Sequence, residues 1–597
     1  MSSLSTPQSK FEQALQSEFA GQYVEAERLY QEVLADVPNH APSADRLGLV
    51  ALARRDPETA LRWFETALGL DPAFPPAWVN AGIALQQLAR LDDAEAMFAN
   101  AIAQGQNAAP AHYLLGKLLW DRGAYKEACE HLSRAIILAP EFANEFQDEL
   151  FNRLNRFDWR GYKAITGMMS DLIAAGRPVS SPLTFMYYSA SVADIGSCAR
   201  TFATRNHPQR TPLWNGEARK PGKIRIGYLC ADYYDHPVAH LHVGVLENHN
   251  HDEFEVFGFS SCPPMDDKIL QRIIPAFDHF FEVANLTDLA IAELVRAQDI
   301  DILVNLSGYT LNARADVMTG RPAPVQVNYL GYPGTMGATY VDYLIADRQV
   351  ISPDETQHYS ENIVLLPHTY QPTDDKAQVA ARTPTRSEQG LHENAFVFLA
   401  YNAPRKISPD TFSAWMRILE SVPGSVIWLM DTGPEAQANA RREAADRGVD
   451  PARLVFAAHA PSREDHLARF RLADLFLDSL PYNAHSTASE AMWVGVPVLT
   501  CRGTTFPGRV GASLLEAAGF PELITHTVAD FEALAVELAK DPVRMANLRK
   551  RMETEGHASP LFQSSTYTRH LEAAYRIMFD NAQKKSPPRH FGVQPIV

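Results

Sequence analysis

Residues 9–142 carry apolar positions at the spacing of amphipathic helices, and the pattern returns at a fixed interval. Alanine and glycine recur at the same constant spacing, at Ala26, Ala60, Ala94 and Ala128, and at Gly48, Gly82 and Gly116. A large residue follows each alanine by four positions, namely Tyr30, Phe64, Phe98 and Leu132. Because several independent positions keep one period, this segment is predicted to form about four similar pairs of helices.

A period of about 34 residues is that of the tetratricopeptide repeat. Small residues let the two helices of a pair approach closely, and the large ones fill the space between pairs. Prolines in the same frame end the second helix, since proline cannot continue one. Such arrays present a concave groove that usually holds a peptide or a partner protein, so the repeats are expected to bind one. The alternative is an array that only caps or dimerises the rest of the chain.

The pattern changes after a helical linker predicted over 143–220. Short apolar, β-rich runs such as "KIRIGYLCA" and "DILVNLSGY" alternate with helical stretches, which is typical of a buried parallel sheet with crossover helices. One such series covers 221–375 and a second covers 390–562, with an amphipathic helix at 563–582 and a tail at 583–597 expected to be flexible. The sequence therefore predicts a helical repeat array followed by two Rossmann-like halves. Ligands of such sheets bind at the carboxyl ends of the strands.

Composition narrows the function classes. The chain of 597 residues has a net charge of -17, which argues against binding duplex nucleic acid or anionic membranes. No run of about 18 apolar residues predicts a membrane span. The start of the chain lacks the apolar core of a signal peptide, and five scattered cysteines fit reduced thiols. These features predict a cytoplasmic protein.

The stretch "LDSLPYNAHSTASEAMW" is the first candidate for chemistry. A predicted strand ends at Asp478, and His485, Ser486 and Thr487 then open a helix. The start of a helix exposes unpaired N–H groups and a partial positive charge, so these residues are predicted to cradle a phosphate. Glu490, one turn further on, is predicted to accept hydrogen bonds from a ribose. The alternative is an ordinary capped helix.

Basic residues near two other strand ends complete the candidate nucleotide site. Lys406, between a strand and a helix, is positioned to neutralise a departing phosphate. His466 and Arg469 lie one turn apart on a predicted helix, where Arg469 is suited to stack on a base. The alternatives are a solvated loop lysine and an exposed helical face.

Five histidines lie within residues 231–251, at His236, His240, His242, His249 and His251. His236 follows the first predicted strand and precedes a proline that begins a helix, so it is expected to face the cleft as a candidate base. The H-x-x-x-H spacing lacks the glutamate of zinc helices, and no metal site is predicted. The last two histidines are expected in a hydrated loop. Asp299 and Asp301, which could be read as a metal-binding D-x-D motif, are expected to flank a strand start.

These motifs together identify a resemblance. The stretches "DHPVAHL", "RKISPDTF", "REDHLARFRLADLFLDS" and "NAHSTASEAMWVGVPVLT", behind tetratricopeptide repeats, resemble the O-linked N-acetylglucosamine transferase family, which includes the SPINDLY type. The resemblance implies a GT-B fold and metal-independent, inverting transfer from a nucleotide sugar to a protein serine or threonine, with no further cofactor. By motif position it implies Lys406, His485, Ser486 and Thr487 at the phosphates, with His466 also on the phosphate side. It implies Arg469 on the base side, Glu490 at the ribose, and His236 as the debated base.

Two departures from the family pattern bear on the sugar. The N-acetylglucosamine enzymes carry Asn-Gln where this chain has Asn402 and Ala403, and histidine where it has Asp301. Both positions are expected near the donor, which argues against N-acetylglucosamine. The architecture resembles that of bacterial flagellin glycosyltransferases, which implies flagellin as acceptor and a CMP-activated nonulosonic acid of the pseudaminic type as donor. The alternatives are a UDP-N-acetylglucosamine-dependent transferase for other cytosolic proteins and a non-catalytic scaffold or secretion chaperone.

Overall fold

The structure of the chain is a computed structural model that describes residues 6–105, 108–217, 221–263 and 265–596. It contains two compact units, one formed by Met1–Phe146 with Arg160–Leu172 and the other by Gln147–Trp159 with Ile173–Val597. Among the described residues, no helix combines the length and apolar character needed to cross a bilayer.

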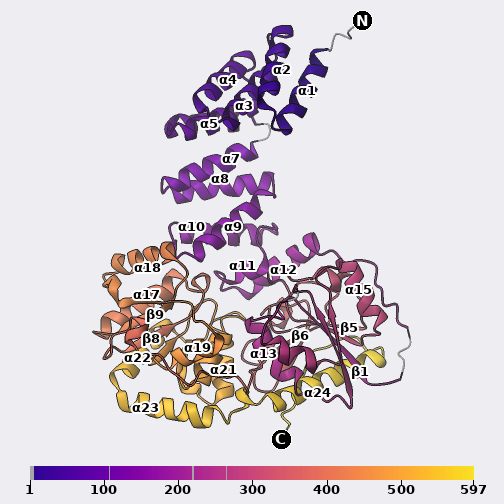
Figure 1. The fold of residues 1–597 in the computed structure, drawn as a ribbon, viewed down its shortest axis with the longest axis vertical. Coiled ribbons are helices and arrows are strands. Elements are labelled where there is room, and N and C mark those ends of the chain that lie inside the picture. The colour runs from indigo at the N-terminus through magenta and orange to yellow at the C-terminus, as the bar shows by residue number, and fades with distance from the viewer. Residues whose placement is uncertain (1–5, 106–107, 218–220, 264, 597) are drawn as a thin grey trace. The chain divides into compact units, whose positions relative to one another are not determined.

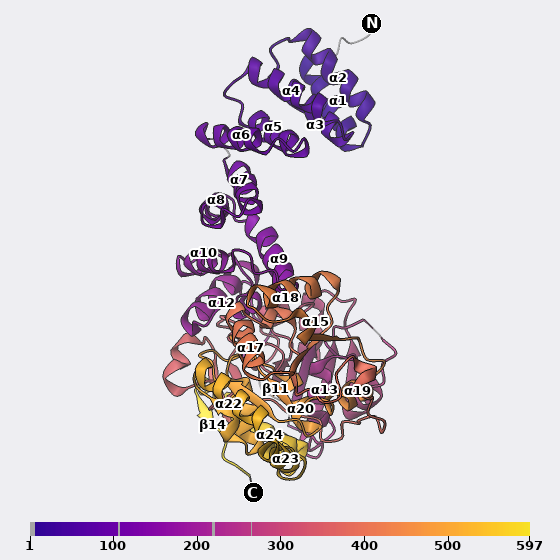
Figure 2. The ribbon, with the colours of Figure 1, turned by 90° about the vertical axis from the view of Figure 1, so that its left-hand side faces the viewer.

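The first unit is built from helix pairs that lie side by side in both views (Figure 1, Figure 2). The pairs are α1 (Pro7–Phe19) with α2 (Tyr23–Asp36), α3 (Ala41–Ala53) with α4 (Pro57–Leu70), α5 (Pro75–Gln87) with α6 (Leu91–Ala103), and α7 (Ala109–Asp121) with α8 (Tyr125–Leu138). Helices α9 (Phe142–Leu154) and α10 (Tyr162–Ala174) follow. The predicted helical array is therefore confirmed.

The repeat period has a direct steric cause within each pair. A Cβ atom added to Gly48 would lie 2.3 Å from the ring of Phe64, and one added to Gly82 would lie 2.4 Å from Phe98. At Gly116 the corresponding contact is Leu132 at 2.7 Å. The periodic glycine is thus the position at which the periodic large side chain of the partner helix rests, so both must recur together.

The second unit includes the end of α9, then α11 (Pro182–Met186) and α12 (Val192–Asn206), and continues into two parallel sheets. The first sheet has the order β14-β7-β6-β5-β4-β1-β2-β3 and the second β10-β9-β8-β11-β12-β13. The strands of the first are β1 (Ile224–Cys230), β2 (Phe254–Ser260), β3 (His279–Glu282), β4 (Ile302–Asn305), β5 (Val325–Asn328), β6 (Tyr343–Asp347), β7 (Asn362–Leu366) and β14 (Phe591–Gly592). Those of the second are β8 (Val397–Ala400), β9 (Val426–Met430), β10 (Leu454–Ala457), β11 (Leu475–Leu477), β12 (Val498–Cys501) and β13 (Ile524–Thr525).

Helices connect and cover the strands, as the two predicted Rossmann-like halves require. In the first half they are α13 (Pro237–Leu246), α14 (Leu270–Ile273), α15 (Asp288–Ala297) and α16 (Asp316–Thr319). In the second they are α17 (Pro409–Ser421), α18 (Pro434–Asp446), α19 (Arg463–Phe470), α20 (Ser486–Trp493), α21 (Val510–Ala518), α22 (Val528–Lys540) and α23 (Pro542–Arg551).

The last helix, α24 (Ser564–Gln583), returns to the first half and packs against α13, as its yellow ribbon among the magenta elements shows (Figure 1). Buried tyrosine hydroxyls connect α24 to the sheet of the first half. Tyr575 contacts Tyr228 of β1 at 3.2 Å, and Tyr567 contacts Tyr329, which follows β5, at 2.6 Å. The expectation of a hydrated loop is wrong for His249, which is buried and lies 3.1 Å from a carboxylate oxygen of Glu572 on α24.

The expectation of a flexible tail over 583–597 is wrong for residues 591–593, and residue 597 lies outside the described residues. Phe591 and Gly592 pair in parallel with Val364 and Leu365 of β7, and the side chain of Val593 is buried in the core of the first half. The tail thereby covers the unpaired edge that β7 would otherwise expose. A sequence rich in proline and charge suggested flexibility, but the docking depends on a strand that lies far away along the chain.

We expect Val593→Asp to lower the free energy of unfolding of the second unit by about 1–3 kcal/mol, because it buries an unpaired carboxylate. Gln594→Asp, at the exposed neighbouring position, is the control and should change stability by less than about 0.5 kcal/mol. Denaturant unfolding of both variants measures the difference. Equal stability of the two variants would mean that the tail does not dock.

Candidate active site

The predicted site residues gather at the carboxyl ends of the strands. His236 follows β1, Lys406 follows β8, and His485 follows β11. Charges on the two halves interact across this edge. The charge of Asp235 on the first half acts to raise the pKa of His466 and of Glu490 on the second. The Lys268 ammonium also lies 3.8 Å from Glu464 on α19. Parallel sheets bind ligands at this edge, so it is the candidate active site.

Lys406 ends a short helical turn, Pro404–Lys406, directly after β8. Its Nζ lies 4.5 Å from the centre of the Tyr482 ring, a cation–π contact that fixes the half-buried side chain. Burial, assisted by the charge of Arg405, lowers the pKa of Lys406 to about 7, while Asp478 opposes this shift. The lysine is therefore held in the site and is not the solvated loop residue of the alternative.

The start of α20 lies against the same tyrosine. The ring of His485 stacks on Tyr482 with centroids 4.8 Å apart, and its Nε2 lies 3.2 Å from the carbonyl oxygen of Pro507. Burial and the nearby Lys406 charge hold the pKa of His485 well below its usual value, so the ring is neutral. Ser486 and Thr487 follow half-exposed, on a helical turn whose first N–H groups have no partner within the helix. Helix start and lysine together form one anion-binding surface.

His466 and Arg469 on α19 lie one turn apart, as predicted, but in different surroundings. The guanidinium of Arg469 is buried, donates to His466 Nδ1 at 2.7 Å and lies 5.0 Å from the centre of the Tyr401 ring. Burial, with the charges of Arg469 and Arg463, lowers the pKa of His466 to about 3. Arg469 thus stacks on a protein ring and holds a neutral, half-exposed His466, and the exposed-face alternative is wrong for Arg469.

Glu490 forms an ion pair that the sequence analysis missed. Arg463, the first residue of α19, donates to Glu490 Oε1 at 2.7 Å, and His466 Nε2 lies 3.9 Å from Oε2. Burial raises the pKa of the Glu490 carboxyl, although the Arg463 charge opposes the shift. Arg463 precedes His466 by three residues, so the one-turn spacing already applied to His466 and Arg469 was the signal that could have found it.

On the first half, His236 caps the start of α13. Its Nδ1 accepts from the Val238 N–H at 3.3 Å and lies 3.8 Å from a buried carboxylate oxygen of Asp232. Burial lowers the pKa of His236, and Asp232 opposes the shift. A neutral ring that accepts at Nδ1 carries its proton on Nε2. Nε2 offers the lone pair of a general base only in the other tautomer, in which the Nδ1–H faces Asp232 and the cap hydrogen bond is given up.

The neighbouring histidines have structural roles. His240 Nε2 lies 2.6 Å from Asp235 Oδ1, and His251 Nδ1 lies 2.9 Å from Asp278 Oδ2. His242 is fully buried, which lowers its pKa to about 3. Within the described ranges, no group of three or more histidines, cysteines or carboxylates is placed to hold a metal ion.

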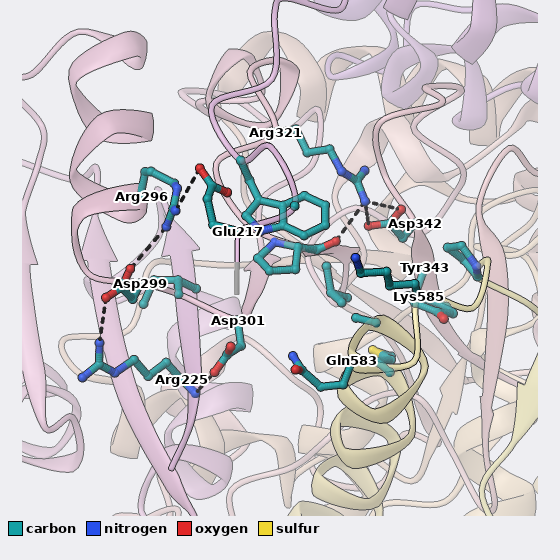
Figure 3. A pocket seen from close by; sticks show the side chains of 18 of the residues that line it. Glu217, Arg225, Arg296, Asp299, Asp301, Arg321, Asp342, Tyr343, Gln583 and Lys585 are labelled. Atoms are coloured by element: carbon teal, nitrogen blue, oxygen red, sulfur yellow. Dashed lines mark hydrogen bonds and ion pairs between the residues drawn. The ribbon is translucent and has the colours of Figure 1, made fainter. Parts of the chain in front are cut away.

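A cavity of about 880 Å³ lies at the opposite edge of the first sheet (Figure 3). Its lining includes Asp301, just before β4, and Tyr343, the first residue of β6, which mark the amino ends of strands. Asp301 Oδ2 accepts from the Arg225 N–H at 2.9 Å, and Arg321 pairs with Asp342 at 3.0 Å. The expectation that Asp301 lies near the donor is therefore wrong, because it belongs to the other end of its strand.

We expect Lys406 to titrate near pH 7. Competitive acetylation followed by mass spectrometry should give a midpoint of about 7 for Lys406, because its charged form is partly desolvated. Lys10, whose hydrogen bond to Asp36 raises its pKa, is the internal reference and should titrate far higher. A Lys406 midpoint near the ordinary value of about 10.4 would contradict the burial of this ammonium.

Comparisons with known proteins match this architecture. The model of glycosyl transferase family 41 matches residues 207–383 and 371–571, and tetratricopeptide repeat models match 12–75, 51–118 and 109–142. The chain is 34% identical to a probable UDP-N-acetylglucosamine–peptide N-acetylglucosaminyltransferase, SEC, of Arabidopsis thaliana, over 65% of this chain and 40% of the relative. It is 25% identical to the UDP-N-acetylglucosamine–peptide N-acetylglucosaminyltransferase of Caenorhabditis elegans, over 72% of this chain and 49% of the relative. It thus spans less than half the length of these curated relatives.

A solved structure shows the same fold. A mutant of the Thermobaculum terrenum O-GlcNAc transferase superposes with a TM-score of 0.61 at 25% sequence identity, covering 98% of this chain and all of that one. The family model spans more than half of the chain and contains every residue of the candidate active site. The chain therefore belongs to glycosyl transferase family 41.

Proposed function

We propose that this chain is a protein O-glycosyltransferase that moves a sugar from a nucleotide-sugar donor to a serine or threonine of a protein acceptor. The observation that carries the proposal is the convergence of Lys406 and the start of α20 on the ring of Tyr482. A cation and a helix start, fixed together at the carboxyl edge of a sheet, suit a diphosphate or phosphate leaving group. The printed names of the relatives support the reaction class.

The chemistry follows from where charge develops. In an inverting transfer, the acceptor oxygen forms a bond to the anomeric carbon while the bond to the donor phosphate breaks on the opposite face. Lys406 and the N–H groups at Ser486 and Thr487 would stabilise the departing phosphate. The acceptor proton would pass to His236 Nε2 in the tautomer that carries its proton on Nδ1, and burial favours the neutral ring that this step needs. Metal independence belongs to the same proposal, with Lys406 supplying the positive charge.

The residues of α19 fit the nucleoside end of the donor. His466 is half-exposed and is fixed by Arg469, and Arg463 and Glu490 offer a donor–acceptor pair beside it. We propose that a ribose or base exchanges hydrogen bonds with this pair. Glu490 then contacts the nucleoside, while the Arg463 charge favours the ionised form of the carboxylate against the effect of burial.

Two combinations of sugar donor and protein acceptor are candidates. The relatives' names favour UDP-N-acetylglucosamine as donor and a peptide as acceptor, whereas the departure at Asn402 and Ala403 favours a different sugar. Asn402 lies in the site, where its Nδ2 donates to Ser479 Oγ at 2.7 Å, while Asp301 lies at the other edge and no longer supports the second choice. A CMP-nonulosonic acid donor with flagellin as acceptor is therefore the second proposal, and the repeats are the acceptor-binding part in either case.

Intact mass spectrometry distinguishes these proposals. The purified chain would be incubated with UDP-N-acetylglucosamine or a CMP-nonulosonic acid and with flagellin or a cytoplasmic protein extract. A regular mass step equal to one sugar residue would establish transfer, and its size would identify the donor. Flagellin of unchanged mass, isolated from cells with and without the gene, would exclude it as acceptor. A chain whose melting temperature no nucleotide raises would instead be a non-catalytic scaffold.

We expect Lys406→Ala to lower the turnover number at least about 100-fold, because the departing phosphate loses its cation. Binding of the acceptor by the repeats should not change, as fluorescence anisotropy with a labelled acceptor would show. Lys540→Ala, at the exposed end of α22, is the matched control and should keep wild-type turnover. Normal turnover of the Lys406 variant would remove this lysine from the mechanism.

A further inference from the structure

The loop between β11 and α20 is folded around a buried carboxylate. The side chain of Asp478 is 3% exposed, and its Oδ1 accepts from the N–H groups of Ser479 at 2.8 Å and Ala484 at 2.6 Å. Its Oδ2 accepts from Thr500 Oγ1 at 2.6 Å. These bonds tie both ends of the loop to one side chain, so the loop cannot change shape without breaking them.

The space around this carboxylate is closed by α21. A Cβ atom added to Gly511 would lie 2.4 Å from Asp478 Oδ2 and 2.6 Å from Thr500 Oγ1. The backbone of α21 therefore packs directly on the carboxylate and its hydroxyl partner. Such burial is costly for a charge, and it persists in folded proteins when hydrogen bonds and an opposite charge compensate for it.

The loop connects Asp478 with the proposed phosphate site. Asn402 donates to Ser479 Oγ at 2.7 Å, and Ser479 Oγ donates to the Tyr482 carbonyl at 2.8 Å. Tyr482 then supports both Lys406 and the ring of His485. Hydrogen bonds through Ser479 thus connect the carboxylate to the tyrosine that contacts both the lysine and the helix start.

We propose that Asp478 is the positioning residue of the proposed glycosyl transfer: its hydrogen bonds fix the 478–485 loop and its charge favours the protonated form of Lys406, without touching the substrate. This inference deepens the proposed function and rests on it. One buried carboxylate then controls both the conformation of the loop and the protonation of the lysine at the proposed phosphate site.

The charges around Lys406 agree with this assignment. Burial raises the pKa of Asp478 to about 6, while its hydrogen bonds and Lys406 oppose the shift. Of the groups that face Lys406, Arg405 lowers its pKa, Asp478 raises it, and His485 is neutral. Asp478 is ionised above about pH 6, and Lys406 loses its proton as the pH rises through about 7. Removing the Asp478 charge must therefore move the loss of the Lys406 proton to lower pH.

The test uses the full chain with Asp478→Asn, which keeps the size and the acceptor oxygen for both loop N–H groups but removes the charge. We expect the acetylation midpoint of Lys406 to fall by about one pH unit. The charged fraction at pH 7 then falls from about half to about a tenth, so kcat/KM should fall roughly fivefold and recover as the buffer is acidified.

Two further variants separate charge from structure. Thr500→Val removes one hydrogen bond to the carboxylate, which raises the pKa of Asp478, and should shift the Lys406 midpoint in the same direction by less. Thr525→Val is the matched control, since it removes a buried hydroxyl that donates to the Thr500 carbonyl at 2.9 Å without touching Asp478. It should lower the melting temperature and leave the midpoint unchanged.

The acetylation midpoints test the role of Asp478 independently of the proposed glycosyl transfer. An unshifted Lys406 midpoint in a folded Asp478→Asn protein would overturn it, and if that variant does not fold, an unshifted midpoint in Thr500→Val would do so. The acetylation measurement needs no substrate. Shifted midpoints in a chain that transfers no sugar would therefore refute the proposed function and leave the coupling of Asp478 to Lys406 intact.

Discussion

The candidate site depends on keeping a positive charge in a place that water only partly reaches. Burial alone would drive the proton from Lys406 near neutral pH, and Arg405 adds to that tendency. The ring of Tyr482 and the carboxylate of Asp478 act in the opposite sense. The same loop that carries these two groups also begins α20, so the lysine and the helix start cannot be placed independently of each other.

The two halves of the second unit share one continuous stretch of chain at its end. Helix α24 and the β14 strand leave the second half and complete the core and the sheet of the first, with buried tyrosine hydroxyls paired between them. Two Rossmann-like halves need such contacts between them, because each half has its own core. Without the contacts, the carboxyl edges of the two sheets would be free to move apart. Asp235, the neighbour of His236, consequently lies close enough for its charge to act on His466 and Glu490 of the second half.

Membership of glycosyl transferase family 41 agrees with this arrangement but leaves the donor open. Most of the chemistry assigned to the site concerns the phosphates, which UDP and CMP donors present in related ways. Asn402 connects two parts of the candidate site, because its Nδ2 donates to Ser479 Oγ and its Oδ1 accepts from Thr487 Oγ1 at 3.5 Å. The identity of the residue beside it, Ala403, is therefore a natural place for donor preference to arise.

The sequence by itself determined what repeats or depends on near neighbours. The repeat period, the order of strands and helices, and the positions of His236, Lys406 and the His485–Thr487 helix start at strand ends were all predictable, because periodicity and turn chemistry act over a few residues. Only the tertiary structure decided the docking of the tail on β7, the burial of His249 and Arg469, the Arg463–Glu490 pair, and the placement of Asp301 at the far edge. Each of these features depends on which distant segment of the chain packs against the residue, and local sequence patterns do not predict such contacts.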